Sequence, residues 1–221
     1  MAKVKKSVLG LPIGKIGNIV YRNMNGKLVV SVRPQNYKAS YSDKAVTARN
    51  MFKSYSKFSS FVNRIYSLAA LWNNPELSGS TTYRKILMAN KDRLSNEFLS
   101  PNNRIAPLTL INPVKSASLI NNTLTLTLSD DAFIPGSTSH QLFIVLAFIK
   151  PLNTNTDFLS FAYLQNEVTF GTYEQVFPLG DHITSNFPLY QEVIAYSALL
   201  FSKDGVQEWF SNKGSSFPLN S

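Results

Sequence analysis

The sequence predicts an α+β protein, in which an N-terminal β-hairpin and a helical hairpin precede a C-terminal antiparallel β-sandwich of the immunoglobulin or fibronectin kind. Three patterns predict it: strand-like runs around Asn25-Gly26, a long helical spacing of apolar residues after Pro34, and short alternating runs from Leu108 onward. The 221 residues are 44% apolar or aromatic and only 16% charged. This composition supports a buried core and excludes wholesale disorder.

The N-terminal hairpin is predicted by the segment Asn18 to Arg33, NIVYRNMNGKLVVSVR. Asn-Gly is the dipeptide that most favours a type I′ turn, because both central residues of that turn need positive φ. Glycines at positions 10, 14 and 17 precede the segment, but their spacing departs from that of a phosphate-binding loop. We expect them to serve strand bending or the close approach of another chain.

One long helix is predicted to begin at Ser42-Asp43, a good N-cap with a first-turn acid, and to end at Asn74-Pro75. Its apolar positions are spaced alternately three and four residues apart, which forms a heptad seam that must be covered. With about 100° per residue, its basic side chains lie nearly opposite the seam. The predicted seam comprises Ala48, Met51, Tyr55, Phe58, Val62, Ile65, Ala69 and Trp72.

A second helix is predicted over residues 82–94, capped by Ser80 or Thr81, and its apolar stripe is expected to close on the long helix as an antiparallel hairpin. The polar, proline-bearing stretch Ser100 to Arg104 is typical of a linker. We therefore predict a basic hairpin and helical region at residues 1–105. A β-sandwich domain is predicted at residues 106–221 and is expected to fold alone.

The C-terminal part carries the sandwich pattern. A turn at Asn121-Asn122 leads into strict alternation of leucine and threonine up to Leu128. Strand-like runs follow at residues 140–149, 158–164, 167–178, 192–202 and 206–210, and Asp204-Gly205 joins the last two as a hairpin. Six or seven short strands in about 110 residues are typical of a sandwich. Tyr196 lies where such folds often carry a tyrosine near the core.

Charge is distributed unevenly along the chain. Residues 1–105 hold 18 Lys and Arg against 4 Asp and Glu, a net of +14, whereas residues 106–221 hold 4 against 9, a net of −5. This asymmetry predicts an anionic partner for the basic half or a head-to-tail contact between copies. The alternative is a solvated basic face that only keeps the protein soluble. The candidate residues for binding a polyanion or a partner are Arg22, Arg33, Arg49, Lys53, Lys57, Arg64, Arg84 and Lys85.

An enzyme is not predicted. The absence of cysteine excludes a disulfide framework, a thiolate metal site and a cysteine nucleophile. His140 and His182 are the only histidines, they lack metal-binding spacing, and we expect each at a strand end or in a loop. No G-x-S-x-G elbow and no carboxylate pair typical of acid and base catalysis is found. We therefore expect no catalytic residue, metal, cofactor or small-molecule substrate.

The stretch GLPIGKIGNIVYRNMNGKLVVSVRP and the basic helix that follows it resemble a Bacteroidota family classified as a domain of unknown function. Gly14, Gly17, Arg33 and Pro34 carry the resemblance together with that helix, and it extends over most of the chain. The resemblance implies a glycine-spaced hairpin, an Arg-Pro, a basic helix and a C-terminal β-domain. It implies no activity.

No signal peptide or membrane helix is predicted. The basic N-terminal stretch has no uninterrupted apolar run of roughly 7–15 residues. The longest apolar run, LFIVLAFI at Leu142 to Ile149, is far below the roughly 20 residues that a spanning helix needs. Its β-branched and aromatic content indicates a buried strand. We therefore expect a soluble protein in the cytoplasm, a virion or another assembly.

Two classes of function remain. The first is a structural or assembly protein whose basic N-terminal half docks on a partner subunit, on a polyanion or on another copy. The second is a nucleic-acid-binding protein, because aromatic residues alternate with cations, as in Tyr37-Lys38 and Lys57-Phe58. Several of these aromatics lie on the predicted seam, and no RNP, helix-turn-helix or zinc-finger signature is present. The first class is preferred.

Overall fold

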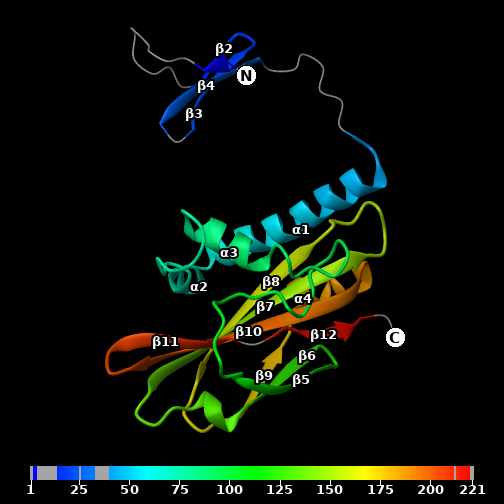
Figure 1. The fold of residues 1–221 in the computed structure, drawn as a ribbon. Helices are drawn as coiled ribbons and strands as arrows, with labels where there is room; N and C mark the ends of the chain where they lie inside the picture. The colour runs from blue at the N-terminus through cyan, green and yellow to red at the C-terminus, as the bar shows by residue number, and fades with distance from the viewer. Residues whose placement is uncertain (1, 4–13, 25, 33–39, 212, 220–221) are drawn as a thin grey trace. The chain divides into compact units, whose positions relative to one another are not determined.

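The computed structural model describes residues 2–3, 14–24, 26–32, 40–211 and 213–219. The chain divides into two compact units, Met1–Ser42 and Asp43–Ser221, called unit 1 and unit 2 below (Figure 1). Helices and antiparallel sheets are both present, so the predicted α+β class is confirmed. Arg33 and Pro34, which the sequence analysis singled out, lie outside the described residues.

Unit 1 contains a sheet with the strand order β1-β4-β3-β2. The predicted hairpin is confirmed, because β3 and β4 pair from Ile19 opposite Val32 to Met24 opposite Lys27. Gly26 has φ +76°, as the turn requires, and Asn25 lies outside the described residues. The strands are β1 (Ala2–Lys3), β2 (Gly14–Ile16), β3 (Ile19–Met24) and β4 (Lys27–Val32).

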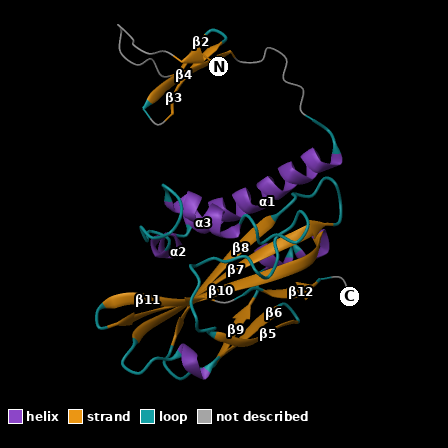
Figure 2. Ribbon diagram, in the orientation of Figure 1, coloured by secondary structure: helices purple, strands orange, loops and turns teal. Residues whose placement is uncertain are grey.

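Unit 2 is built in three layers. Figure 2 shows helices on one side of a larger sheet and a smaller sheet on the other side. The described strands of the larger sheet are ordered β11-β10-β7-β8, with β12 also paired to β10, and the smaller sheet is ordered β5-β6-β9. The strands are β5 (Val114–Ile120), β6 (Thr123–Leu128), β7 (Thr138–Pro151), β8 (Ser160–Val168), β9 (Glu174–Pro178), β10 (Tyr190–Lys203), β11 (Val206–Ser211) and β12 (Ser215–Pro218).

Unit 2 also contains helices. The helical layer consists of three α-helices, and a fourth, one-turn helix and two 3-10 turns connect the strands. The α-helices are α1 (Asp43–Arg64), α2 (Tyr66–Leu71), α3 (Thr82–Asn90) and α4 (Asp181–Thr184), and the 3-10 turns are η1 (Asp130–Ala132) and η2 (Phe187–Leu189).

The two central strands, β7 and β10, are buried on both faces. One face of β7, with Phe143 and Val145, packs against the helical layer, and the other face, with Leu142 and Ile144, packs against the smaller sheet. A strand covered on both sides has no solvent face, so its sequence is an uninterrupted apolar run. This explains the run LFIVLAFI and confirms that it forms a strand.

The predicted long helix is broken at Ile65, which corrects the expectation of one helix up to residue 74. Ile65 has φ −85° and ψ 102°, an extended conformation, and α2 begins at the next residue. Val62 and Leu71 are both buried in the core of unit 2. In an unbroken helix these two residues would point in opposite directions, because nine steps of about 100° end half a turn away. The break therefore allows both side chains to be buried.

The seam itself is covered within unit 2. Phe58, Val62 and Trp72 are buried against the larger sheet and α3, whereas Ala48 at the start of the seam is exposed. The helix also buries serines, whose hydroxyls bond to backbone carbonyls, as Ser59 Oγ does to the carbonyl of Tyr55 at 2.6 Å. Buried serines of this kind cannot be predicted from the spacing of apolar residues.

The second predicted helix corresponds to α3 and is shorter than expected, ending at Asn90. The Thr81 hydroxyl caps it by accepting a hydrogen bond from the backbone N–H of Arg84 at 3.3 Å. The hydroxyls of Tyr83 and Ser56 lie 2.9 Å apart and join α3 to α1. Ile86 is fully buried between the helices and the sheet.

The stretch predicted to be a linker is partly buried in unit 2, with Ser100 and Asn103 inside and Asn102 exposed. The Asn90 Oδ1 atom accepts the backbone N–H of Arg104 at 2.7 Å, and Trp72 Nε1 donates to the carbonyl of Ile105 at 3.0 Å. Tyr196 Oη, on β10, donates to the carbonyl of Ser100 at 2.8 Å. The division between compact units falls after residue 42, whereas the sequence predicts a domain boundary near residue 105.

The two tight hairpins of the C-terminal part form as predicted. Asn121 and Asn122 have φ 48° and 59° and join β5 to β6. Asp204 and Gly205 have φ 51° and 77° and join β10 to β11. Positive φ at both central residues is the signature of type I′ turns, which match the twist of the flanking strands.

Candidate interaction surfaces

One face of the unit 1 sheet is basic. Arg22 pairs with Val29 across β3 and β4, and Lys27 pairs with Met24 two residues further along. Lys15 on β2 pairs with Val20. Residues directly opposite each other share a face, and so do alternate residues of a strand. Lys15, Arg22 and Lys27 therefore lie on one face of the sheet, and all three are exposed.

The other face of the unit 1 sheet is apolar. Ile16 pairs with Ile19, which pairs with Val32, and Tyr21 pairs with Val30 on the same face. Ile16 is 64% exposed and Val32 is 72% exposed. The three cations therefore lie on the face opposite to these side chains, a face that they share with Val20 and Val29. We call the face with Lys15, Arg22 and Lys27 the basic face.

The structural units divide the charge more sharply than the predicted halves do. Residues 1–42 hold 8 Lys and Arg and no Asp or Glu, a net of +8, and residues 43–221 hold 14 against 13, a net of +1. Within unit 2, residues 43–105 carry 10 against 4, and residues 106–221 carry 4 against 9. The basic helical layer therefore lies on an acidic β-region of the same unit, and the uncompensated charge belongs to unit 1.

Two of the candidate cations on α1, Lys53 and Lys57, contact the segment that precedes β8. Lys57 Nζ lies 3.7 Å from a carboxylate oxygen of Asp157, and Lys53 Nζ lies 5.0 Å from the centre of the Phe158 ring. Arg64 is exposed and lines, with Lys57, a groove of about 350 Å³ beside the start of β8. Arg49 is also exposed. The structure thus brings Lys57 and Arg64 together and assigns Lys53 and Lys57 contacts within the chain.

The candidate cations on α3 bond to loops of unit 2. Arg84 Nη1 donates to Ser80 Oγ at 3.0 Å, and Lys85 Nζ donates to the carbonyl of Asn74 at 2.6 Å. Both interactions hold the connection between α2 and α3. Both candidate cations therefore bond within unit 2.

Of the seven candidate residues that the structure describes, Arg22 is the one that lies on the basic face of unit 1. Lys15 and Lys27, its companions there, were absent from the candidate set. They can be found only from the alternation of side chains along the strands together with the pairing register. To predict that register, the positions of both turns must be known, and the density of charge is not enough.

A groove of about 410 Å³ lies at one end of the larger sheet, between the start of β7 and the segment after β8. Phe170 lines it and is 53% exposed, and Tyr173 nearby is 42% exposed. Both rings contact Phe133, with ring centres 5.3 and 5.4 Å away. Two large aromatic side chains are thus held at the surface by a buried third.

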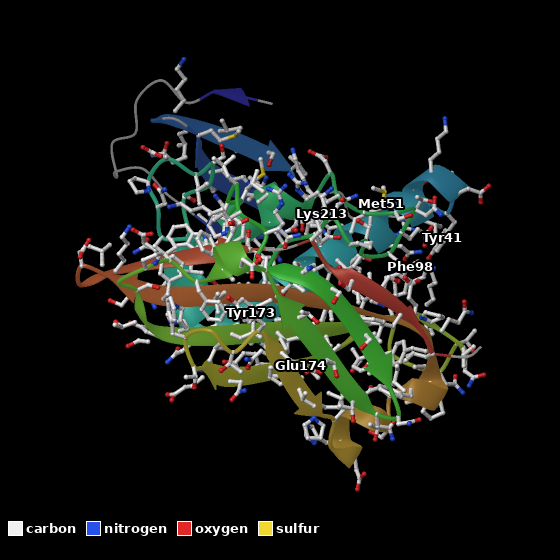
Figure 3. All side chains as sticks on the ribbon, turned by 90° about the horizontal axis from the view of Figure 1, so that it is seen from below. Tyr41, Met51, Phe98, Tyr173, Glu174 and Lys213 are labelled. Atoms are coloured by element: carbon white, nitrogen blue, oxygen red, sulfur yellow. The ribbon has the colours of Figure 1, made fainter. Side chains whose placement is uncertain are left out.

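Carboxylates lie within three residues of each of these aromatic residues along the chain. Glu167 lines the groove, Glu174 follows Tyr173, and the 3-10 turn η1 carries Asp130 and Asp131 just before Phe133. All four are exposed, and within the described residues none forms an ion pair. Figure 3 shows Tyr173 and Glu174 on the same side of unit 2. We call the surface formed by Asp130, Asp131, Glu167, Phe170, Tyr173 and Glu174 the acidic end.

A serine and a histidine that line the groove are joined by a hydrogen bond. His140 Nε2 lies 2.9 Å from Ser137 Oγ, which donates its own proton to the carbonyl of Ile134 at 2.5 Å. A hydroxyl has one proton, so the histidine Nε2–H must be the donor to Ser137. His140 therefore does not accept the serine proton, and burial lowers its pKa. It lies near the start of β7, which confirms its predicted place at a strand end.

Beside β12, one carboxylate is held in its charged form. Burial alone would raise the pKa of Glu192, but hydrogen bonds from Lys150 and Ser216, together with the Lys150 charge, bring that pKa below its ordinary value. The Lys150 Nζ atom lies 2.6 Å from Glu192 Oε2. This pair joins β7 to β10, so it is structural.

The described part of the chain holds neither a metal-ligating cluster nor a helix able to span a membrane. Among residues 2–3, 14–24, 26–32, 40–211 and 213–219, no group of three or more His, Asp or Glu side chains is placed to hold a metal ion. No helix in these ranges is both long enough and apolar enough to span a lipid bilayer.

Comparison with known proteins finds no family model that matches this sequence and no curated protein significantly similar to it. The resemblance to a Bacteroidota family therefore stays a prediction. Function must be inferred from the geometry and charge of the chain itself.

Proposed function

We propose that this chain is a non-catalytic assembly protein, in which unit 2 is the structural body and unit 1 binds a negatively charged surface of a protein partner. One observation carries the proposal: residues 1–42 hold eight cations and no carboxylate, whereas unit 2 is close to neutral. A region with uncompensated charge on an otherwise neutral protein attracts an oppositely charged partner and orients it.

We infer that the β-region of the body is an immunoglobulin-like sandwich. Its first, second and fifth strands, β5, β6 and β9, form one sheet, and β8, β7, β10 and β11 form the other. Sandwiches of this kind likewise place their first, second and fifth strands in one sheet and their third, sixth and seventh strands in the other. The leucines of β6 meet the inward face of β7 across the sandwich, which supports the inference.

The body supports a structural role because its helices are fixed to it. Phe58, Val62 and Trp72 share one core with β7 and β10, and the fully buried Tyr196 joins the same core. Lys53 and Lys57 of α1 contact Phe158 and Asp157 of the same unit. The helical layer is therefore part of the body, and unit 1 is the part of the chain that offers uncompensated charge.

Binding of nucleic acid is the second candidate function, because any polyanion would be attracted to eight cations. Proteins that bind single strands through a sheet add aromatic side chains on which bases stack. Among the described strands of unit 1, Tyr21 is the one aromatic residue, and it lies on the apolar face, opposite Arg22. This arrangement favours a protein partner.

Carbodiimide cross-linking of the full-length protein tests the proposed function, because it joins lysine amines to carboxylates that are already in contact. In an extract of cells that produce the protein, Lys15 and Lys27 are expected to be linked to protein carboxylates several times more often than Lys44 and Lys115. The latter two are exposed lysines of unit 2 and serve as matched controls.

Two outcomes would contradict the proposal. Equal cross-linking of the four lysines would show that the charge of unit 1 has no partner. Ultraviolet cross-linking of unit 1 to nucleic acid, together with no enrichment of carboxylate links, would favour the second candidate function.

A further inference from the structure

We propose that the partner of unit 1 is a second copy of this chain, and that the basic face of one copy binds the acidic end of unit 2 of the next. This inference rests on the proposed function and names its partner. Each surface is defined above by described residues of one unit, so the proposal requires no particular placement of the two units within a chain.

The charges of the two surfaces are complementary. The basic face presents Lys15, Arg22 and Lys27, and unit 1 as a whole has no carboxylate. The acidic end presents four exposed carboxylates, and none is neutralised by an ion pair within the described residues. Opposite potentials of this kind speed encounter and select the partner, whereas like charges repel.

The uncharged groups on the two surfaces also fit each other. Met24 lies on the basic face and is 58% exposed. Phe170 and Tyr173 are exposed at the acidic end, and Phe133 holds both rings in place. Methionine sulfur makes favourable contacts with aromatic rings, and arginine or lysine stacks on their faces. Protein interfaces commonly combine aromatic anchors with a polar rim.

The contact is expected to be head-to-tail. The two surfaces lie on different units and have opposite charge, so neither can pair with itself. When two different surfaces of identical chains meet, an open assembly has one unfilled surface of each kind at its ends. Such an assembly either closes into a ring or grows into a filament as the concentration rises.

Sedimentation velocity of the full-length protein tests the proposal through two charge-reversal variants. The first carries Lys15→Glu and Lys27→Glu, and the second carries Glu167→Lys and Glu174→Lys. Wild type is expected to associate as its concentration rises and to dissociate at high salt, because exposed charges are screened. Each variant alone is expected to raise the dissociation constant by at least about tenfold, since like charges then face each other.

An equimolar mixture of the two variants is the decisive experiment. In the mixture, the unaltered basic face of the second variant meets the unaltered acidic end of the first, and the two altered surfaces are again complementary. Association is therefore expected to return. The control variant Glu76→Lys, Glu208→Lys, which alters exposed carboxylates outside the acidic end, is expected to associate like wild type.

Three results would overturn the inference. The first is a wild-type chain that stays monomeric at every concentration. The second is a control variant that weakens association as much as Glu167→Lys, Glu174→Lys does. The third comes from mixing isotopically labelled and unlabelled chains: carbodiimide links from Lys27 to Glu174 that never join the two kinds of chain would show a contact within one molecule.

The proposed function can survive such a failure. If wild type is monomeric but Lys15 and Lys27 are still cross-linked to carboxylates of another protein, unit 1 has a different acidic partner. If those lysines are not enriched in cross-links either, both proposals fail.

Discussion

His140 illustrates how a single hydrogen bond decides the chemistry of a residue. Serine and histidine side chains at 2.9 Å could be mistaken for a nucleophile and its base. The Ser137 hydroxyl gives its only proton to a backbone carbonyl, so the histidine is a donor. Phe133, Phe170 and Phe201 surround its ring. The imidazole is therefore a buried packing group near the start of β7.

A titration effect follows from this burial. The native state holds the pKa of His140 below its ordinary value of about 6.5, whereas the unfolded chain regains that value. As pH falls below about 6.5, the unfolded state takes up a proton that the native state resists, so the free energy of unfolding should decrease. In the variant His140→Gln this contribution should vanish. Urea unfolding between pH 5 and 8 measures it, and an unchanged pH slope in the variant would contradict the assignment.

Tyr196 connects two layers of unit 2 through its hydroxyl. Its side chain is fully buried, burial raises its pKa well above the ordinary value, and Oη donates to the Ser100 carbonyl. That carbonyl also accepts the backbone N–H of Asn103. Tyr196→Phe should therefore lower the free energy of unfolding by only about 0.5–1.5 kcal/mol.

Chemical denaturation checks this value. Tyr66→Phe is the matched control because Tyr66 is 88% exposed, and it should change stability by less than about 0.5 kcal/mol. Equal effects of the two substitutions would show that the Tyr196 hydroxyl contributes nothing.

The helix α1 depends on its buried face for stability. Phe58 is fully buried and contacts Phe161 and Tyr196 with ring centres 6.1 and 5.2 Å away, whereas Phe52 is 54% exposed. Phe58→Ala should cost about 3–5 kcal/mol, because it removes a large side chain from a packed core. Phe52→Ala makes the same chemical change on the other side of the helix and should cost less than about 1 kcal/mol.

Thermal or urea unfolding of both variants measures the difference. Similar losses would mean that α1 does not pack on the sheet through this face.

Local features of the fold were predictable from sequence, and features set by tertiary contacts were not. The turns at Asn121-Asn122 and Asp204-Gly205 follow from residues that accept positive φ, so short segments specify them. The break at Ile65 has no proline or glycine to mark it. It depends on the burial of Leu71 and Trp72 in a core formed by strands more than seventy residues away.

The candidate surfaces show the same division. Arg22 was predicted because cations are dense in the N-terminal part of the sequence. Lys15 and Lys27 join it only through the strand register. The acidic end gathers residues from η1, β8, β9 and the segment between these strands, and no short stretch of sequence contains them all. Sequence reasoning found the net charge of the C-terminal part but could not find this surface.

At the scale of the whole molecule, the core shared by helices and sheet predicts the behaviour of fragments. Residues 43–221 include both the helical layer and the strands that it covers and should fold alone. Residues 106–221 would expose one face of β7 and β10, including Phe143 and Ile194. Despite the expectation from sequence, that shorter fragment should be unfolded or aggregated, because exposed apolar surface of this size is unfavourable.

Circular dichroism and size-exclusion chromatography of the two fragments check this. A monomeric fragment 106–221 with a cooperative unfolding transition would show that the helical layer is dispensable.

The distribution of charge is the central feature of the whole molecule. The chain has a net charge of +9, and eight of these charges lie in residues 1–42. If this charge serves only solubility, its position along the chain does not affect association. If it binds a partner, association depends on which residues carry the charge.

The most direct test compares two variants that have equal net charge. One carries Lys15→Gln, Arg22→Gln and Lys27→Gln in unit 1, and the other carries Lys44→Gln, Lys115→Gln and Lys213→Gln in unit 2. Sedimentation velocity at low and physiological salt measures association of each full-length chain. The account predicts that only the unit 1 variant loses association and its salt dependence. Equal behaviour of the two variants would contradict it, because net charge and not the basic face would then be the cause.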